Sequence, residues 1–383
     1  MALTVRRIGA EQHRAWVATR DSVSFLQLPQ WGQVKVGWRP ESIGWFDGST
    51  LVGTGLVLHR PVPRMPKRTL AYLPEGPCID WLRQELPGYR IEDWIDPMLR
   101  HCRQQGAFMV KMGPPVPLRR WSAQTIKSGI ADLGADSQGG PRKLTDMIAD
   151  WHSPAGIGLS ERLLAHGWLQ QPTTGAGFGD VQPRFVFQVP LQGRTLDEVF
   201  AGFNQLWRRN VRKAEAAGVG VSQGSMEDLA GFHEVYVETA TRDRFTPRAL
   251  AYFQRMWSAL NDDAERLTLW LAHHDGHLAA ATLMVQVGDH AWYSYGASTT
   301  ADREVRPSNA LQWAMLQHAH QAGCQVYDMR GIANTIDPDE HLFGLVQFKV
   351  GTGGYAQELA GEFDMVLRPM WAWAYRQAQG RLG

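Results

Sequence analysis

The sequence predicts an α/β protein made of two similar lobes, each built on a mixed β-sheet. The 383 residues exceed the usual size of one hydrophobic core, so two lobes of ordinary domain size are expected. The order of predicted elements runs twice along the chain. Each run contains a hairpin with an Asp-Gly turn, at Asp47-Gly48 and Asp275-Gly276, and closes with a helix, a glycine and an apolar strand. Together these observations indicate a duplicated lobe.

The first run of elements is read from apolar periodicity and turn residues. Pro29 suits the start of a helix, and Gly106 suits the left-handed position that ends one. In chain order we expect a strand at 3–8, helices at 11–20 and 28–35, a hairpin of 44–46 with 51–58, a strand near 70–73, a helix at 91–105 and a buried strand at 107–112.

The second run follows the same order. We expect a strand at 185–189, a long helix at 204–217, helices around Val235 and Tyr252, and the hairpin about Asp275-Gly276. The endings also match: the run from Met98 to His101 resembles the run from Met315 to His318, and each is followed by a glycine and an apolar strand. This similarity supports the duplication.

The predicted boundaries place residues 1–183 in the first lobe, with a Pro-, Gly- and Ser-containing excursion at 114–179 that ends in a short helix at 158–166. Residues 184–360 form the second lobe. Residues 361–383 supply a strand at 363–367 and an aromatic helix at 371–379, which we expect to return to the first lobe.

Composition excludes several classes of protein. The formal net charge is only +1, so any nucleic-acid contact must be local. Cys78, Cys102 and Cys324 are an odd number without a C-x-x-C pair, which favours a reducing cytoplasm. The N-terminus lacks the apolar core of a signal peptide, and no run approaches the roughly 18 apolar residues of a membrane span. A cytoplasmic protein is expected, and peripheral contact with the inner membrane face stays open.

Most catalytic motifs are absent from the sequence. There is no nucleophile elbow, phosphate-binding loop or dinucleotide fingerprint. His273, His274 and His277 surround a turn and are expected to be solvated rather than to bind a metal, because neighbouring strand residues face opposite sides. No cofactor or metal is predicted.

The repeated order of elements resembles the GNAT acyltransferase fold. Ordinary members hold coenzyme A on an R/Q-x-x-G-x-G/A turn that opens a helix, and no clean copy of that turn is present. The fold therefore indicates acyl transfer, whereas the usual acyl donor is disfavoured.

Seven blocks of sequence, in family order, resemble the FemABX family of tRNA-dependent peptidoglycan interpeptide-bridge aminoacyltransferases, which are built from two GNAT-like lobes. The blocks are Ser24 to Lys35, Tyr72 to Pro77, Thr241 to Phe245 with Arg248 and Tyr252, Trp292 to Ala297, Tyr327 to Gly331, Leu345 to Gly353, and Gly361 to Asp364. The actinobacterial branch with FemX-like and VanK-like members is the most similar.

Two features depart from the family pattern. Many relatives carry an acidic residue, often Asp followed by Pro, after the strand that here ends at Met112, but this chain has Gly113-Pro114-Pro115. A role for that carboxylate as a base is therefore in doubt. The family's coiled-coil arm is also absent, because no sustained heptad pattern is present. The expected fold is two GNAT-like lobes without an arm.

The resemblance implies transfer of an aminoacyl group, with glycyl preferred on branch similarity, from aminoacyl-tRNA to the stem-peptide amine of a peptidoglycan precursor. The precursor is lipid II or its nucleotide-linked pentapeptide form. Because the donor is already an activated ester, neither ATP nor a metal is required. The partners implied are glycyl-tRNA and the precursor.

The resemblance assigns substrate binding to five residues. Lys35 and Arg248 would contact the precursor's diphosphate, because cations suit phosphate oxygens; their spacing alone would indicate solvated helix residues. Tyr252, Tyr293 and Tyr295 would line a peptide channel. Tyr293 and Tyr295 are two apart on a predicted strand and are expected to share one face, which could equally be core.

Phe348 and Lys349 form the predicted catalytic pair. Aminolysis of an ester passes through a tetrahedral oxyanion, and a fixed cation stabilises the charge that develops there. Lys349 is assigned this role. The alternative is a lysine that ends a strand in solvent, and for Phe348 a core position is equally compatible.

The most basic helix carries the predicted tRNA contacts, Arg208, Arg209, Arg212 and Lys213, beside the aromatic Trp207. A local cluster of cations suffices for phosphate binding on a nearly neutral protein. A solvated helix face is the alternative.

Two other functions remain compatible with the sequence. One is the same tRNA-dependent transfer to a small molecule or peptide antibiotic, and the other is a non-catalytic module that binds precursor. The sequence does not define the amino acid, the number added, the acceptor amine, the general base or the oligomeric state.

Overall fold

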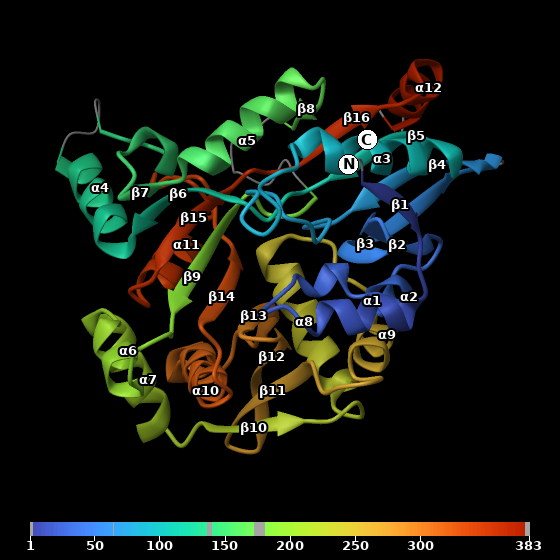
Figure 1. Ribbon diagram of the computed structural model, residues 1–383. Helices are drawn as coiled ribbons and strands as arrows, with labels where there is room; N and C mark the ends of the chain where they lie inside the picture. Colours follow the sequence, from blue (N-terminus) through green and yellow to red (C-terminus); the bar gives the residue numbers. More distant parts are fainter. Residues whose placement is uncertain (1–2, 64, 136–139, 172–180, 380–383) are drawn as a thin grey trace. The chain divides into compact units, whose positions relative to one another are not determined.

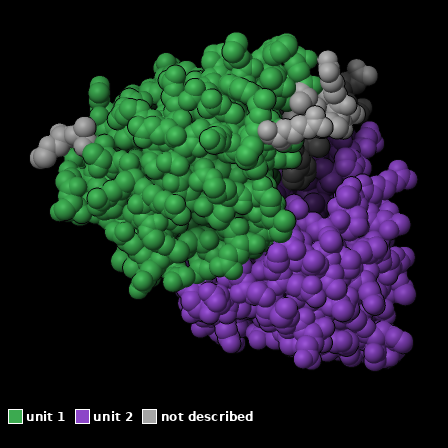
Figure 2. All heavy atoms as spheres, turned by 90° about the vertical axis from the view of Figure 1, so that its right-hand side faces the viewer, with its two compact units in different colours: residues 1–120, 151–184, 358–383 green, residues 121–150, 185–357 purple. Residues whose placement is uncertain are grey.

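The computed structural model describes residues 3–63, 65–135, 140–171 and 181–379, and Figure 1 labels its helices and strands. The chain forms two compact units, coloured in Figure 2. Unit 1 contains residues 1–120, 151–184 and 358–383, and unit 2 contains residues 121–150 and 185–357. Residues 121–150, expected with the first lobe, thus belong to unit 2. The reason is apolar burial, since Trp121 and Ile126 are both 0% exposed in that unit's core.

Unit 1 contains most of the elements expected in the first run, together with others from residues 151–171 and from the C-terminal tail. They are β1 (Thr4–Arg7), α1 (Ala10–Val17), α2 (Trp31–Val34), β2 (Arg39–Asp47), β3 (Thr50–Val62), β4 (Met65–Leu73), α3 (Ile91–Gln104), β5 (Ala107–Met112), β7 (Trp151–His152), α5 (Pro154–Ala165), β8 (Leu169–Gln170), β16 (Phe363–Val366) and α12 (Pro369–Gln379). The helix expected at 28–35 is shorter than predicted: a 3₁₀ turn at Phe25–Gln27 precedes a single turn, α2.

The strands of unit 1 form a mixed sheet in the order β1-β2-β3-β4-β5-β16-β8, in which β4 and β5 run parallel. The C-terminal strand β16 pairs antiparallel with β5, so the tail does return to the first lobe's sheet. Because side chains alternate in direction along each strand, the sheet has two distinct faces. Val57, Ala71 and Val110 pack into the main core together with the apolar side of α3, whose buried Trp94 and Met98 are one helical turn apart.

A buried polar network ties three elements of unit 1 together. The Glu41 carboxylate of β2 lies 2.9 Å from Nε2 of His59 in β3 and 3.1 Å from Nε2 of His101 in α3. Burial opposes ionisation of Glu41, but the hydrogen bonds from His101 and His59 dominate and lower its pKa to about 2. The network therefore holds a carboxylate inside the core.

Unit 2 contains the second run. Its elements are α4 (Ala123–Ala135), β9 (Phe185–Pro190), α6 (Leu196–Gly202), α7 (Gln205–Ala216), β10 (Gly220–Gly224), α8 (Leu229–Asp243), α9 (Leu250–Leu260), β11 (Leu267–His274), β12 (His277–Val287), β13 (His290–Ser298), α10 (Pro307–Gln321), β14 (Val326–Gly331) and α11 (Phe343–Val350). Strands β6 (Pro117–Ser122) and β15 (Tyr355–Leu359) each span a boundary between the units.

The strands of unit 2 are ordered β10-β11-β12-β13-β14-β9-β15. Strands β13 and β14 run parallel but pair only from His290 with Val326 to Trp292 with Asp328, although both continue beyond that point. In unit 1 the equivalent parallel pair, β4 with β5, stays paired up to Leu73 with Met112. The backbone at the end of β14 is therefore free of β13 and can bond elsewhere.

The duplication predicted from the sequence is visible in the strand, helix, parallel-strand units β4-α3-β5 and β13-α10-β14. Gly106 and Gly323 follow the two helices with φ of +93° and +77°, a conformation that glycine adopts without strain. No helix in the described ranges is both long and apolar enough to cross a membrane.

Candidate functional site

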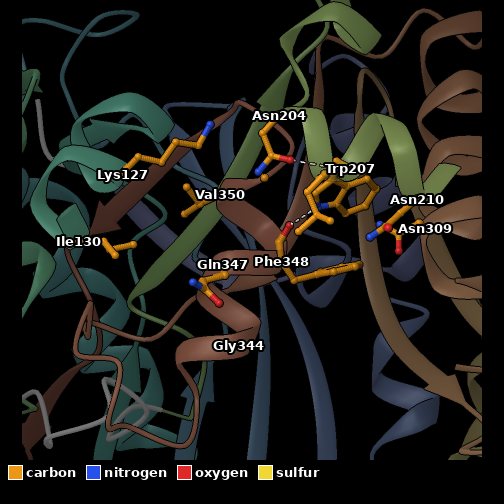
Figure 3. A pocket seen from close by; sticks show the side chains of 12 residues that line it. Lys127, Ile130, Asn204, Trp207, Asn210, Asn309, Gly344, Gln347, Phe348 and Val350 are labelled. Atoms are coloured by element: carbon orange, nitrogen blue, oxygen red, sulfur yellow. Dashed lines mark hydrogen bonds between the residues drawn. The ribbon is translucent and has the colours of Figure 1, made fainter. Parts of the chain in front are cut away.

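A cavity of about 480 Å³ lies in unit 2 between helices α4, α7 and α11, with α10 contributing one residue (Figure 3). The residues that line it are Lys127, Ile130, Asn204, Leu206, Trp207, Asn210, Asn309, Gly344, Gln347, Phe348, Val350 and Gly351. The wall thus combines two aromatic rings with several amide side chains and one lysine. Such a mixture suits a ligand with flat apolar surface and hydrogen-bonding groups.

Trp207 and Phe348 join α7 to α11 at this cavity. Their ring centroids are 4.8 Å apart, and the Trp207 Nε1 donates a hydrogen bond of 2.7 Å to the Phe348 carbonyl oxygen. The N-cap residue Asn204 fixes the start of α7, because its Oδ1 accepts from the Trp207 backbone N–H at 2.8 Å (Figure 3). A Cβ at Gly351 would lie 2.1 Å from the indole, so glycine is required for this close approach.

Lys349 lies on another side of α11 and is not among the residues that line the cavity. Its side chain is buried, and its Nζ donates to the carbonyl oxygens of Met329 at 2.7 Å and Gly331 at 2.5 Å. Both carbonyls belong to the part of β14 that has left β13. The alternative of a lysine ending a strand in solvent is therefore wrong: the residue is helical, and consecutive helix positions point Phe348 and Lys349 in different directions.

The electrostatic setting of Lys349 is unusual for a lysine. Burial lowers its pKa from 10.5 to about 7, with Asp328 opposing the shift and Arg330 adding to it. Asp328 is itself buried, which opposes its ionisation, but the His290 imidazole, whose Nε2 lies 3.5 Å from the carboxylate, keeps its pKa below the usual range. A pKa shifted this far by burial is a property that clusters at functional sites.

The basic helix α7 presents its four cations away from the core. Trp207 and Val211 face inward, and the cationic side chains are exposed or half-buried. Arg208 donates to the Ala201 carbonyl oxygen at 3.0 Å, Arg212 lies 5.7 Å from the Phe200 ring, and Lys213 lies 3.6 Å from Glu304. Arg209 is exposed. The same helix contributes Asn204, Trp207 and Asn210 to the region of the cavity.

Three of the predicted substrate residues in unit 2 come together. The hydroxyls of Tyr252 and Tyr295 are 3.0 Å apart, and the Arg248 guanidinium lies 4.7 Å from the Tyr252 ring centroid. Burial raises the pKa of Tyr252. Tyr236 and Phe253 complete this aromatic cluster against Tyr295.

Tyr293 does not share a face with Tyr295, which corrects the prediction. Leu283 pairs with Tyr295 whereas Met284 pairs with Tyr293, so Ser294 is an extra residue in the strand. Such a bulge breaks the alternation of side chains. Tyr293 consequently packs with Met284 against the main core of unit 2, while Tyr295 faces α8 and α9.

Lys35 lines a second cavity, of about 690 Å³, in unit 1. Its lining residues are Lys35, Trp38, Leu58, Arg60, Leu70, Tyr72, Met109, Lys111, Leu169, Gln170, Gln171, Val181, Asp364 and Tyr375. On β3, β4 and β5 the lining residues alternate along each strand with the residues that face the main core. The cavity therefore lies against the opposite face of the sheet. The Lys35 ammonium lies 5.5 Å from the Trp31 ring centroid.

A buried carboxylate, that of Glu362, lies beside Gly113. A Cβ at Gly113 would lie 3.4 Å from Cγ of Glu362, which accepts hydrogen bonds from the Tyr72 hydroxyl at 2.5 Å and the Val181 N–H at 2.9 Å. Burial raises the pKa of Glu362. Sequence reasoning did not select this residue, although a Glu within the otherwise apolar run before β16 is a signal of a buried polar group.

Other functional candidates were also missed. Asp328 was noted only as part of a family block, yet a charged residue inside an apolar strand already indicates a paired buried charge. Lys127 lies in the segment that was read as an excursion, so no local signal connected it with α7. Among the described residues, no three His, Cys, Asp or Glu side chains are grouped to hold a metal, and His274 instead lies 3.0 Å from Asp302.

Comparison with known proteins gives consistent results. A lipid II:glycine glycyltransferase of Staphylococcus saprophyticus is 24% identical over 419 residues, covering 93% of this chain and 91% of that protein. One of Staphylococcus aureus strain MRSA252 is 23% identical with the same coverage. The crystal structure of FemX matches with a TM-score of 0.77 and 21% identity over 96% of this chain and 99% of that one.

A tandem GNAT protein from the clavulanic acid pathway matches with a TM-score of 0.50 and 12% identity, over 95% of this chain and 98% of that one. These structural matches confirm the predicted fold of two GNAT-like lobes. The FemAB family model matches residues 8–275 and 271–379, which together cover nearly the whole described chain. The chain therefore belongs to the FemAB family.

Proposed function

We propose that this chain is an aminoacyltransferase that moves an aminoacyl group, by preference glycyl, from aminoacyl-tRNA to the stem-peptide amine of a peptidoglycan precursor. Membership of the FemAB family and the glycyltransferase names of its relatives support the reaction class and the precursor. The tRNA donor and the particular amine are the finer parts of the proposal.

The observation that carries the proposal is the meeting of α7 and α11 at the unit 2 cavity. The basic helix that would contact tRNA phosphates also supplies Trp207, whose ring packs on Phe348. Phosphate contacts on Arg209, Arg212 and the neighbouring cations would hold the RNA next to a cavity with aromatic and amide walls. The flat terminal base of the tRNA is a group that such walls accommodate.

Lys349 and its surroundings would serve the chemical step. The amine attacks the ester carbonyl, a tetrahedral oxyanion forms, and the ribose oxygen leaves with the electron pair of the broken C–O bond. An ammonium has three N–H donors, and Lys349 gives two to Met329 and Gly331. The third would be available for the oxyanion. In the alternative role, the neutral form that the low pKa permits would receive the proton that the amine loses and pass it to the leaving ribose oxygen.

The acceptor would be bound by the tyrosines and by the two predicted phosphate-binding cations. The Arg248, Tyr252 and Tyr295 group combines a cation with phenolic hydroxyls, and Lys35 lines the unit 1 cavity. Cations of this kind bind diphosphate oxygens through charge-assisted hydrogen bonds. Tyr293 is half-buried on the other face of β13, against the main core, so its role would be to support the strand rather than to contact a peptide.

The test is a transfer assay with pooled charged tRNA and either lipid-linked or nucleotide-linked precursor, read by the mass of the product. We expect the precursor mass to increase by one or more glycyl residues with charged tRNA and to stay unchanged with deacylated tRNA. Precursor that binds without gaining mass would contradict the proposal and indicate a binding module. Transfer only to small-molecule acceptors would refute the peptidoglycan assignment.

A further inference from the structure

One face of helix α12 forms a wall of the unit 1 cavity, and the opposite face is exposed to solvent. Ala372 is 2% exposed and packs with Trp371 and Tyr375 on the small core cluster around Phe108. Tyr375 also lines the cavity. On the opposite side, Met370 is 81% exposed and Trp373 is 66% exposed. A large aromatic and a methionine are therefore both open to water on the same face of the helix.

The tip of the β3–β4 hairpin lies beside this helix. Val62 packs on the same core cluster as α12, and the Arg68 guanidinium lies 5.6 Å from the Trp371 ring centroid. Met65, 46% exposed, and the exposed Lys67 precede Arg68 in β4. We call the set Met65, Lys67, Arg68, Met370 and Trp373 the α12 surface.

The charge of these segments is one-sided. Neither residues 51–74 nor residues 365–383 contain an Asp or Glu, whereas both contain cations, on a chain whose net charge is only +1. The described cations include Arg60, Lys67, Arg68 and Arg368. A surface that interleaves cations with exposed methionine and tryptophan matches an anionic lipid surface in both charge and polarity.

We propose that the α12 surface docks unit 1 on a bilayer that contains anionic phospholipid, with Met370 and Trp373 entering the interface and Lys67 and Arg68 contacting headgroup phosphates. Two apolar residues in the wall of the unit 1 cavity support this proposal. Leu169 and Val181 are 51% and 64% exposed, so apolar surface continues from the α12 surface to the cavity. The inference rests on the proposed function in one respect: docking would favour a precursor that is linked to a lipid.

Lipid fits the α12 surface better than RNA does. RNA would use the cations and could stack a base on Trp373, but it gains nothing from aliphatic Met65 and Met370 side chains held in water. Insertion of apolar side chains into the acyl boundary is favourable because it removes their surface from water. The pattern of exposed residues therefore favours a membrane.

The experiment is sedimentation of the full chain with vesicles of phosphatidylcholine, alone or with roughly one third phosphatidylglycerol. Parent protein should sediment with the anionic vesicles and less as salt is raised. Met370→Ser combined with Trp373→Ser should weaken this binding at least tenfold, and Lys67→Glu should weaken it severalfold. The matched controls, Ile148→Ser with Met226→Ser for exposed apolar residues of unit 2 and Lys143→Glu for charge, should bind as the parent does.

Transfer activity separates this inference from the proposed function. The Met370 and Trp373 double variant should keep parental turnover with water-soluble nucleotide-linked precursor and lose activity with lipid-linked precursor in vesicles. The proposal would be overturned if the parent protein did not bind anionic vesicles. It would also be overturned if the double variant bound them as tightly as the parent does. A double variant that loses affinity for tRNA instead would identify an RNA surface and overturn it too. Vesicle binding remains a valid test even if no precursor is a substrate.

Discussion

Replacement of Lys349 by methionine tests the predicted chemistry most directly. If the ammonium stabilises the oxyanion, single-turnover transfer at saturating precursor should fall about a hundredfold or more, because removing such a donor costs about 3 to 4 kcal/mol of transition-state stabilisation. Binding of both substrates should change little, since Lys349 lines neither the unit 2 cavity nor the unit 1 cavity. Lys349→Arg should rescue only in part, because a planar guanidinium places its charge differently.

The structure also indicates that Lys349→Met keeps its fold. In the parent protein the pKa of Lys349 is lowered from 10.5 to about 7. When Lys349 is fully protonated, the free energy of unfolding is therefore lower by roughly 5 kcal/mol. The unfolded chain binds more protons between these pH values, so the parent gains stability as pH rises from about 7 to about 10.5. The variant removes this cost but leaves the Met329 and Gly331 carbonyls unpaired, at about 1 to 3 kcal/mol each. The two effects roughly cancel.

The pH dependence distinguishes the roles of Lys349. Dividing the turnover of the parent by that of Lys349→Met at each pH cancels the effect of the ionisation of the acceptor amine. That effect is the same for both proteins. An ammonium role predicts that this ratio falls about tenfold for each pH unit above about 7, whereas a neutral base predicts that it rises up to about 7. A lysine that only positions α11 predicts a ratio that is flat with pH and a parallel loss of stability in chemical denaturation. Transfer by Lys349→Met at the parental rate would refute the catalytic assignment.

Three further predictions follow from the described contacts. Lys35→Ala and Arg248→Ala should each weaken affinity for nucleotide-linked precursor more than they slow the bound complex, and parental affinity in calorimetry would exclude a diphosphate role for that residue. Arg208→Glu combined with Arg212→Glu should raise the KM for aminoacyl-tRNA and make this KM less dependent on salt concentration. An unchanged salt dependence would indicate that the cations of α7 only face solvent and do not contact tRNA. Because the pKa of Glu41 is lowered to about 2, its contribution of roughly 3 kcal/mol is present above about pH 4.5 and lost as pH falls towards 2. Glu41→Gln should therefore denature more easily at pH 7 and show a weaker acid dependence, and equal urea midpoints would contradict this.

The sequence alone determined the fold class and most of the elements. The buried strand predicted at 107–112 and the glycine that follows the preceding helix are present, because a run of apolar residues and a left-handed position are local requirements. The repeat was also visible, since both copies must bury the same kind of helix against the same kind of strand.

Only the tertiary structure decided how the site is arranged. A single extra residue, Ser294, reversed the face of Tyr293 relative to Tyr295, and the register that reveals it belongs to the pairing with β12. Likewise, segment 121–150 joined unit 2 through Trp121, which no local pattern indicates. The environment of Lys349 depends on carbonyls about 20 residues earlier in a strand that separates from its neighbour. Local propensity is encoded in neighbouring residues, whereas burial, register and pKa are set by residues distant in sequence, and so the sequence named the candidate residues while the fold determined their surroundings.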